Sequence, residues 1–160
     1  MKLARVAVTM VAVLAVATMA WAQRPDFSGN WTLDADASGG APGGGGRGRG
    51  RGGMGLGQAA TVKQTADTLT VERTIGENKV VSTYKLDGTE SKNTMMGRGG
   101  NQMESVSVSK WDGQTLTITS KQEMGGQTFE STQRWSLAGN VLTVETTNAR
   151  GTQKMVYKKS

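Results

Sequence analysis

Residues 105–119, SVSVSKWDGQTLTIT, decide the fold class. Valines alternate with serines up to Trp111, and after Asp112-Gly113 a leucine and an isoleucine alternate with threonines. Alternation with a period of two residues is typical of a β-strand that turns one face toward a core. An Asp-Gly pair between two such runs is a strong hairpin signal. The stretch therefore predicts two antiparallel strands joined by a two-residue turn.

The same pattern continues in both directions. Runs rich in Thr and Val recur from residue 69 to the C-terminus, separated by turn signals such as Asp87-Gly88, Gly125-Gly126 and Gly139-Asn140. Phe27–Leu33 supplies a first strand, with Phe27, Gly29, Trp31 and Leu33 on one face. No stretch shows a helical period, so the sequence predicts an all-β, antiparallel up-and-down meander. Closure into a β-barrel of about eight to ten strands would remove its exposed edges. An open sheet or a two-sheet sandwich is the alternative.

The first 22 residues have the organisation of a signal peptide. Lys2 and Arg5 precede an apolar run over residues 6–19, and Ala20-Trp21-Ala22 is a small-x-small cleavage site. The run is too short for a spanning helix, which needs roughly 20 apolar residues. We therefore expect residues 1–22 to be cleaved and residues 23–160 to form one secreted or periplasmic domain. Stable membrane insertion is not expected after cleavage.

Residues 39–57 form a Gly/Arg-rich tract, with 12 glycines among 19 residues. This composition cannot bury enough apolar surface to offset its ordering entropy, so a flexible, disordered loop is expected after the first strand. The tract carries Arg47, Arg49 and Arg51. With three arginines and no interleaved aromatic residue, it favours weak contact with anionic surfaces over nucleic-acid binding.

Composition excludes several kinds of catalytic site. The chain contains no cysteine and no histidine, which rules out Ser-His and Cys-His nucleophiles and the usual zinc, copper(II) and haem sites. A hydrolase built on paired carboxylates is the enzymatic alternative, and Asp26 and Glu104 are candidates that folding could bring together. We expect no enzymatic activity and no cofactor.

Two motifs offer metal ligands, and neither predicts a metal site. Asp34-x-Asp36-x-Ser38-Gly39 starts like a calcium loop, but Gly45 stands where the twelfth-position acid belongs. A strand end whose Asp and Ser accept turn amides is the preferred interpretation. Met95-Met96 and Met103 could offer thioethers to copper(I), but methionines beside a hairpin more often form adaptable apolar surface.

Two segments resemble the calycin group, which comprises the lipocalins and the fatty-acid-binding proteins. Asp26-Phe27-Ser28-Gly29-Asn30-Trp31 is similar to the Gly-x-Trp opening strand of that group. The region from Trp111 to Lys159 resembles the closing half of a fatty-acid-binding barrel, with its W-D-G turn, L-T-I-T, Arg134-Trp135, V-L-T-V and terminal M-V-Y-K-K strand. The resemblance implies a barrel with an internal cavity.

Two departures separate the chain from fatty-acid-binding proteins. The glycine tract occupies the place of their helix-turn-helix lid. Their ligand carboxylate is commonly held by an Arg two residues before a Tyr on the last strand, and here Met155 precedes Tyr157 at that spacing. The resemblance therefore implies the fold and a cavity, but not fatty-acid binding.

Alternating strand positions identify an expected apolar interior. In this interpretation Trp31 either lines the cavity floor or seals the barrel bottom against a basic stem from a neighbouring strand. Arg134 has the opposite parity to Trp135 and is expected to face solvent. The candidate ligand-binding residues are Trp31, Tyr84, Val108, Ile118, Phe129, Trp135, Val144 and Tyr157.

Two functions remain open at this point. The first is an exported lipocalin-like protein that binds a small apolar ligand inside the barrel. The second is a non-enzymatic surface or assembly protein with a packed barrel, using the Gly/Arg-rich loop as its contact element. A void of a few hundred cubic ångström favours the first, and a solid interior favours the second.

Overall fold

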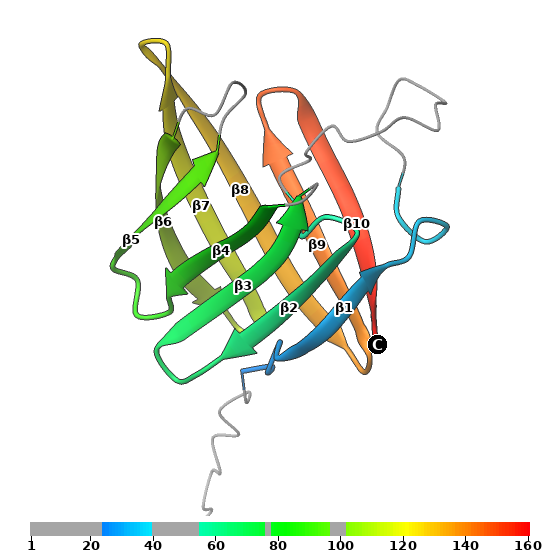
Figure 1. Cartoon of the computed structure of the whole chain (residues 1–160). Helices are drawn as coiled ribbons and strands as arrows, with labels where there is room; N and C mark the ends of the chain where they lie inside the picture. Colours follow the sequence, from blue (N-terminus) through cyan, green and yellow to red (C-terminus); the bar gives the residue numbers. More distant parts are fainter. Residues whose placement is uncertain (1–23, 40–54, 76–77, 97–101) are drawn as a thin grey trace, which may run out of the picture.

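The computed structural model describes residues 24–39, 55–75, 78–96 and 102–160 (Figure 1). Within these ranges every regular element is a β-strand, which confirms the all-β expectation, and no helix there could cross a membrane. The expected signal peptide and most of the glycine tract, including Arg47, Arg49 and Arg51, lie outside the described residues. The strands are β1 (Gly29–Leu33), β2 (Ala59–Gln64), β3 (Thr68–Ile75), β4 (Asn78–Lys85), β5 (Glu90–Met96), β6 (Gln102–Asp112), β7 (Thr115–Met124), β8 (Gln127–Ala138), β9 (Val141–Asn148) and β10 (Gly151–Lys159).

All ten strands form one antiparallel sheet in the order β4-β3-β2-β1-β10-β9-β8-β7-β6-β5. The last strand pairs with the first, as Trp31↔Lys159 and Leu33↔Tyr157, so the meander curls into a nearly closed barrel (Figure 1). This confirms the predicted up-and-down barrel.

Glycines set three of the hairpin turns. Gly113 and Gly139 each take a positive φ, 58° and 59°, at the first position of a two-residue loop. Gly125 and Gly126 both take positive φ, 61° and 77°, between Met124 and Gln127. These conformations suit the tight turns that match strand twist, and they cost other residues steric strain.

Side chains join the two edge strands, β4 and β5. The Asn93 side chain accepts from the Thr83 N–H at 2.7 Å and donates to the Thr83 carbonyl at 3.1 Å. The Ser91 hydroxyl accepts from the Lys85 N–H at 2.7 Å. We call this junction the seam, because side-chain amide and hydroxyl groups there do what a backbone ladder does elsewhere.

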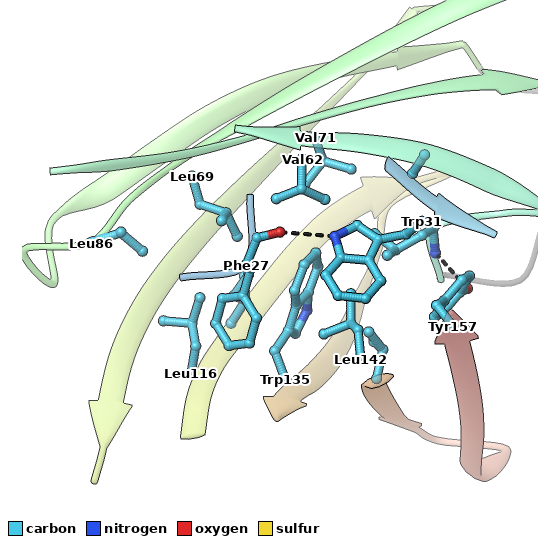
Figure 2. Close-up of a cluster of buried hydrophobic side chains, with 14 residues drawn as sticks. Phe27, Trp31, Val62, Leu69, Val71, Leu86, Leu116, Trp135, Leu142 and Tyr157 are labelled. Atoms are coloured by element: carbon cyan, nitrogen blue, oxygen red, sulfur yellow. Dashed lines mark hydrogen bonds between the residues drawn. The ribbon is translucent and has the colours of Figure 1, made fainter. Parts of the chain in front are cut away.

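The apolar core lies toward one end of the barrel, where β1 begins and β10 ends (Figures 1 and 2). The strands contribute to it through alternate positions, as the sequence predicts for a sheet with one buried face. Its buried members are Phe27, Trp31, Leu56, Ala60, Val62, Leu69, Val71, Leu86, Leu116, Ile118, Trp135, Leu142, Val144 and Tyr157.

Candidate functional site

Four aromatic side chains close one end of the barrel, and we call them the floor: Phe27, Trp31, Trp111 and Trp135. Phe27 stacks on Trp111 with ring centroids 5.9 Å apart and meets Trp135 edge-on at 5.7 Å. The Trp31 indole N–H donates to the Phe27 carbonyl at 2.8 Å (Figure 2). Trp31 and Trp135 are each only 1% exposed, so this end is sealed by packing.

A basic side chain covers the floor, as the sequence predicts. The Lys159 ammonium lies 5.6 Å from the Trp31 ring centroid, and β10 is the hydrogen-bonded neighbour of β1. The Arg24 guanidinium lies 5.4 Å from the Trp111 ring centroid. Cation–π contacts of this kind add to the area that the aromatic rings bury. Trp31 therefore seals the barrel bottom.

Above the floor the interior becomes polar. On β6, β7 and β8 the inward row Trp111–Leu116–Trp135 is followed by Ser109–Ile118–Gln133 and then by Ser107–Ser120–Ser131. The hydroxyls of Ser107 and Ser120 lie 2.8 Å apart in a hydrogen bond. We call the buried polar side chains the polar band: Ser82, Ser91, Asn93, Ser105, Ser107, Ser109, Ser131 and Thr146.

The inward face ends in an apolar rim, made of Met103, Met124 and Phe129. These residues continue the inward parity of β6, β7 and β8 at the end opposite the floor. Phe129 is 41% exposed and Met124 is 50% exposed, although both belong to the face that is buried further down. The rim therefore combines an inward orientation with an uncovered apolar surface.

Most of the predicted ligand-binding residues face the interior. Trp31, Ile118, Trp135, Val144 and Tyr157 belong to the buried core, and Tyr84 packs against it. Phe129 belongs to the rim. Of these seven predicted residues, six are packed in or against the core, and Phe129 has accessible apolar surface.

Val108 departs from the expected interior position. Its neighbours Ser107 and Ser109 are fully buried, whereas Val106, Val108 and Lys110 line a hollow on the outer face of the sheet. The prediction that the valines of β6 face the interior was therefore wrong, because its serines face the interior instead. The position of Trp111 carried the correct signal, because it shares its parity with the three buried serines of β6.

The end of the glycine tract also differs from the expected solvated loop. Gly55 and Leu56 are buried, and the Leu56 N–H donates to the Tyr157 hydroxyl at 3.1 Å. The Arg73 guanidinium donates to the Gly55 carbonyl. An apolar leucine among the glycines was the sequence signal for this anchor.

Two tyrosines in the barrel interior have raised pKa values. Burial raises the pKa of Tyr157 to about 12, against opposing effects of the Leu56 N–H and of the positive charge of Arg73. Burial likewise raises the pKa of Tyr84. Both phenols are therefore neutral at physiological pH and serve as hydrogen-bonding groups.

The carboxylates that suggested chemistry or metal binding do not converge. Asp26 accepts from the Ser28 N–H at 2.9 Å beside the floor, while Glu104 pairs with Lys92 at 3.2 Å on β6. Asp34 pairs with Lys158 at 2.7 Å and accepts from the Ala37 N–H, the turn role that the sequence favours. In the part of the chain that the structure describes, no three potential acidic ligands gather around one point.

Comparison with solved structures shows the fold. The structure titled "REP1-NXSQ fatty acid transporter" superimposes with a TM-score of 0.54 at 12% identity, covering 83% of this chain and 95% of that one. A second, secretory abundant heat soluble protein 4 from Ramazzottius varieornatus, gives a TM-score of 0.48 at 21% identity over 64% of this chain and 68% of that one. No protein-family model and no curated protein matches the sequence. The chain has a calycin-like barrel fold.

Proposed function

We propose that the protein is a non-enzymatic binding barrel that takes a small, mainly apolar molecule at its open end. The observation that carries the proposal is the rim, where Phe129 and Met124 point along the inward face and stay 41% and 50% exposed. Burying such a side chain is worth about 1.5–3 kcal/mol. Because these side chains are already about half covered, an apolar ligand seated against the rim would gain the remaining part of this energy from each of them.

The polar band gives such a ligand an orientation. The Ser109 hydroxyl is buried and has no hydrogen-bond partner among the described residues. A buried polar group without a partner costs free energy, and a polar ligand group or an ordered water would recover it. We therefore propose an amphipathic ligand, with its apolar part at the rim and its polar part toward the serines.

The comparison with solved structures supports a binding barrel and leaves the class of ligand to the residues of this chain. One solved structure with this fold is named as a fatty acid transporter, and at 12% identity it supports the barrel rather than the ligand. Met155 stands two residues before Tyr157, where the family that the sequence resembles commonly has the Arg that holds the ligand carboxylate. We infer a small hydrophobic molecule with a hydrogen-bonding group.

Titration with the fluorescent apolar anion 1-anilinonaphthalene-8-sulfonate tests the proposal. We expect Phe129→Ser and Met124→Ser each to weaken binding by about 3- to 10-fold, because each removes the apolar contact area that is still exposed at the rim. Val81→Ser is the matched control, since Val81 is 47% exposed on the outward parity of β4. Equal effects of all three substitutions, or no binding to the native chain, would exclude a ligand site at the rim and favour the packed-barrel alternative.

We further propose that the chain is exported. The support is the sequence of residues 1–22, which lie outside the described residues. N-terminal sequencing of the protein recovered from its producing cells should read from Gln23. A chain that retains Met1 in the cytoplasmic fraction would contradict export.

A further inference from the structure

One peptide group of the chain is held inside the barrel by two side chains from different strands. The carbonyl of Gly55 accepts from the Arg73 guanidinium on β3. The N–H of the same peptide group, that of Leu56, donates to the Tyr157 hydroxyl on β10 at 3.1 Å (Figure 2). The Arg73 side chain thus binds the carbonyl of this amide as a donor, and the Tyr157 hydroxyl binds its N–H as an acceptor.

The space around this amide limits which groups can be attached to its carbonyl carbon and to its nitrogen. A Cβ atom on Gly55 would lie 2.3 Å from the Met155 sulfur and 3.1 Å from the Tyr157 hydroxyl oxygen. A methyl group on Gly55 would therefore require the flexible Met155 side chain to move. On the other side of the amide the Leu56 side chain is 3% exposed within the core. The pocket therefore fits a small group on the carbonyl side and an apolar group on the nitrogen side.

The two side chains that bind this amide have complementary hydrogen-bonding roles. The arginine guanidinium carries only hydrogen-bond donors. The Tyr157 hydroxyl stays protonated, donates to the Met155 sulfur at 3.1 Å and keeps a lone pair for an N–H. An ester or a carboxylate could satisfy Arg73 but would offer no N–H to Tyr157.

We propose that the barrel interior is a recognition site for secondary amides, occupied here by the protein's own Gly55–Leu56 peptide group. A short peptide or an N-acyl amino acid with the same substituents competes with this segment for Arg73 and Tyr157. The inference rests on the proposed function only in treating the protein as a binding barrel, and it names a site apart from the rim, next to the row Trp31–Ala60–Arg73.

Tethering explains why the site is filled by its own chain. A tethered segment competes at an effective concentration of about millimolar. A substitution that weakens the contacts of the Gly55–Leu56 segment should make Arg73 and Tyr157 accessible to an added amide. Leu56→Ala removes most of the buried anchor, and Gly55→Ala places a methyl group against Met155, so the two variants release the segment by different means.

The test titrates acetyl-Gly-Leu-amide into the full chain and into both variants, followed by the NMR signals of Tyr157 and Arg73. We expect the variants to bind this probe at least about tenfold more tightly than the native chain. Acetyl-Ala-Leu-amide should bind them about 5- to 100-fold more weakly, because its extra methyl group overpacks the space beside Met155. The ester analogue that lacks the N–H should bind about 2- to 12-fold more weakly.

Either of two results would overturn the inference. One is a folded variant that binds none of the probes, and the other is equal binding of the glycine, alanine and ester probes. The rim titration separates this outcome from the proposed function. Binding of the naphthalene probe without peptide binding rejects amide recognition alone, and peptide binding without a rim effect rejects the proposed rim site alone.

Discussion

The side chain of Lys159 crosses the space that a Cβ atom on Gly29 would fill. That Cβ would lie 2.5 Å from the Lys159 Cε, and Gly29 has a φ of +147°. The lysine stem can move, but the backbone conformation would still strain any other residue. The glycine thus allows the Lys159 ammonium to lie over Trp31 at the floor.

Gly29→Ala should lower the free energy of unfolding by about 1–3 kcal/mol, the usual cost of a strained backbone position. Chemical denaturation measures this loss. Gly39→Ala is the control, since Gly39 has no positive φ and no atom lies within 4 Å of its added Cβ. A Gly29 variant as stable as the Gly39 variant would show that the floor does not depend on this glycine.

Tyr157 predicts a loss of stability in alkali. Burial raises its pKa in the folded protein to about 12, from an ordinary value of 10.0. A raised pKa contributes stability that is fully present below pH 10 and is lost as the pH rises toward 12, because the unfolded chain releases the proton first. The expected loss is about 2–3 kcal/mol across this window. Tyr157→Phe should be less stable at pH 8 but should lack this part of the alkaline loss, and parallel pH curves for both chains would contradict the assignment.

Among the elements, β4 and β5 are neighbours that the seam joins, with no backbone ladder between their described residues. Asn93→Ala should cost about 1–3 kcal/mol, because it removes two hydrogen bonds and leaves the Thr83 N–H and carbonyl without their partner. Hydrogen exchange at the Thr83 and Lys85 amides should accelerate. Thr94→Ala, an exposed neighbour on the same strand, should leave both rates unchanged, and unaltered exchange in Asn93→Ala would show that the seam is held by other contacts.

Strands marked by alternating apolar residues and by turn glycines were predictable from the sequence. Two strands, β2 and β5, were not identified from it. The hairpin around Gly113 follows from Asp112-Gly113 and the flanking runs, and Gly125-Gly126 and Gly139-Asn140 act as predicted. β5 has the sequence ESKNTMM, and among its described side chains, those of residues 90–94, the buried ones are the polar Ser91 and Asn93, so hydrophobic alternation does not mark it. Ser91 and Asn93 are buried because they bond to the backbone of β4, a contact that forms only when β4 and β5 come together in the folded barrel.

At the scale of the whole molecule, the interior is layered from an aromatic floor through a polar band to an apolar rim. The floor was predictable, because Phe27, Trp31 and Trp135 are large apolar residues at the inward positions that strand alternation predicts. The polar band was not, because the phase of β6 follows from small serines that are buried where valines are not. Hydrophobic patterning assumes an apolar interior, whereas this barrel buries hydroxyl groups at its centre.

The two phenylalanines of the chain mark the two ends of this layered interior. Phe27 is fully buried at the floor, and Phe129 is 41% exposed at the rim. In protein labelled with 4-fluorophenylalanine, a soluble paramagnetic agent should broaden the Phe129 fluorine signal and leave that of Phe27 sharp. Titration with the naphthalene probe should shift the Phe129 signal alone, because a ligand can reach the rim but not the packed floor. Phe129→Leu assigns the signals, and a shift of the Phe27 signal as large as that of Phe129 would show that ligands enter through the floor.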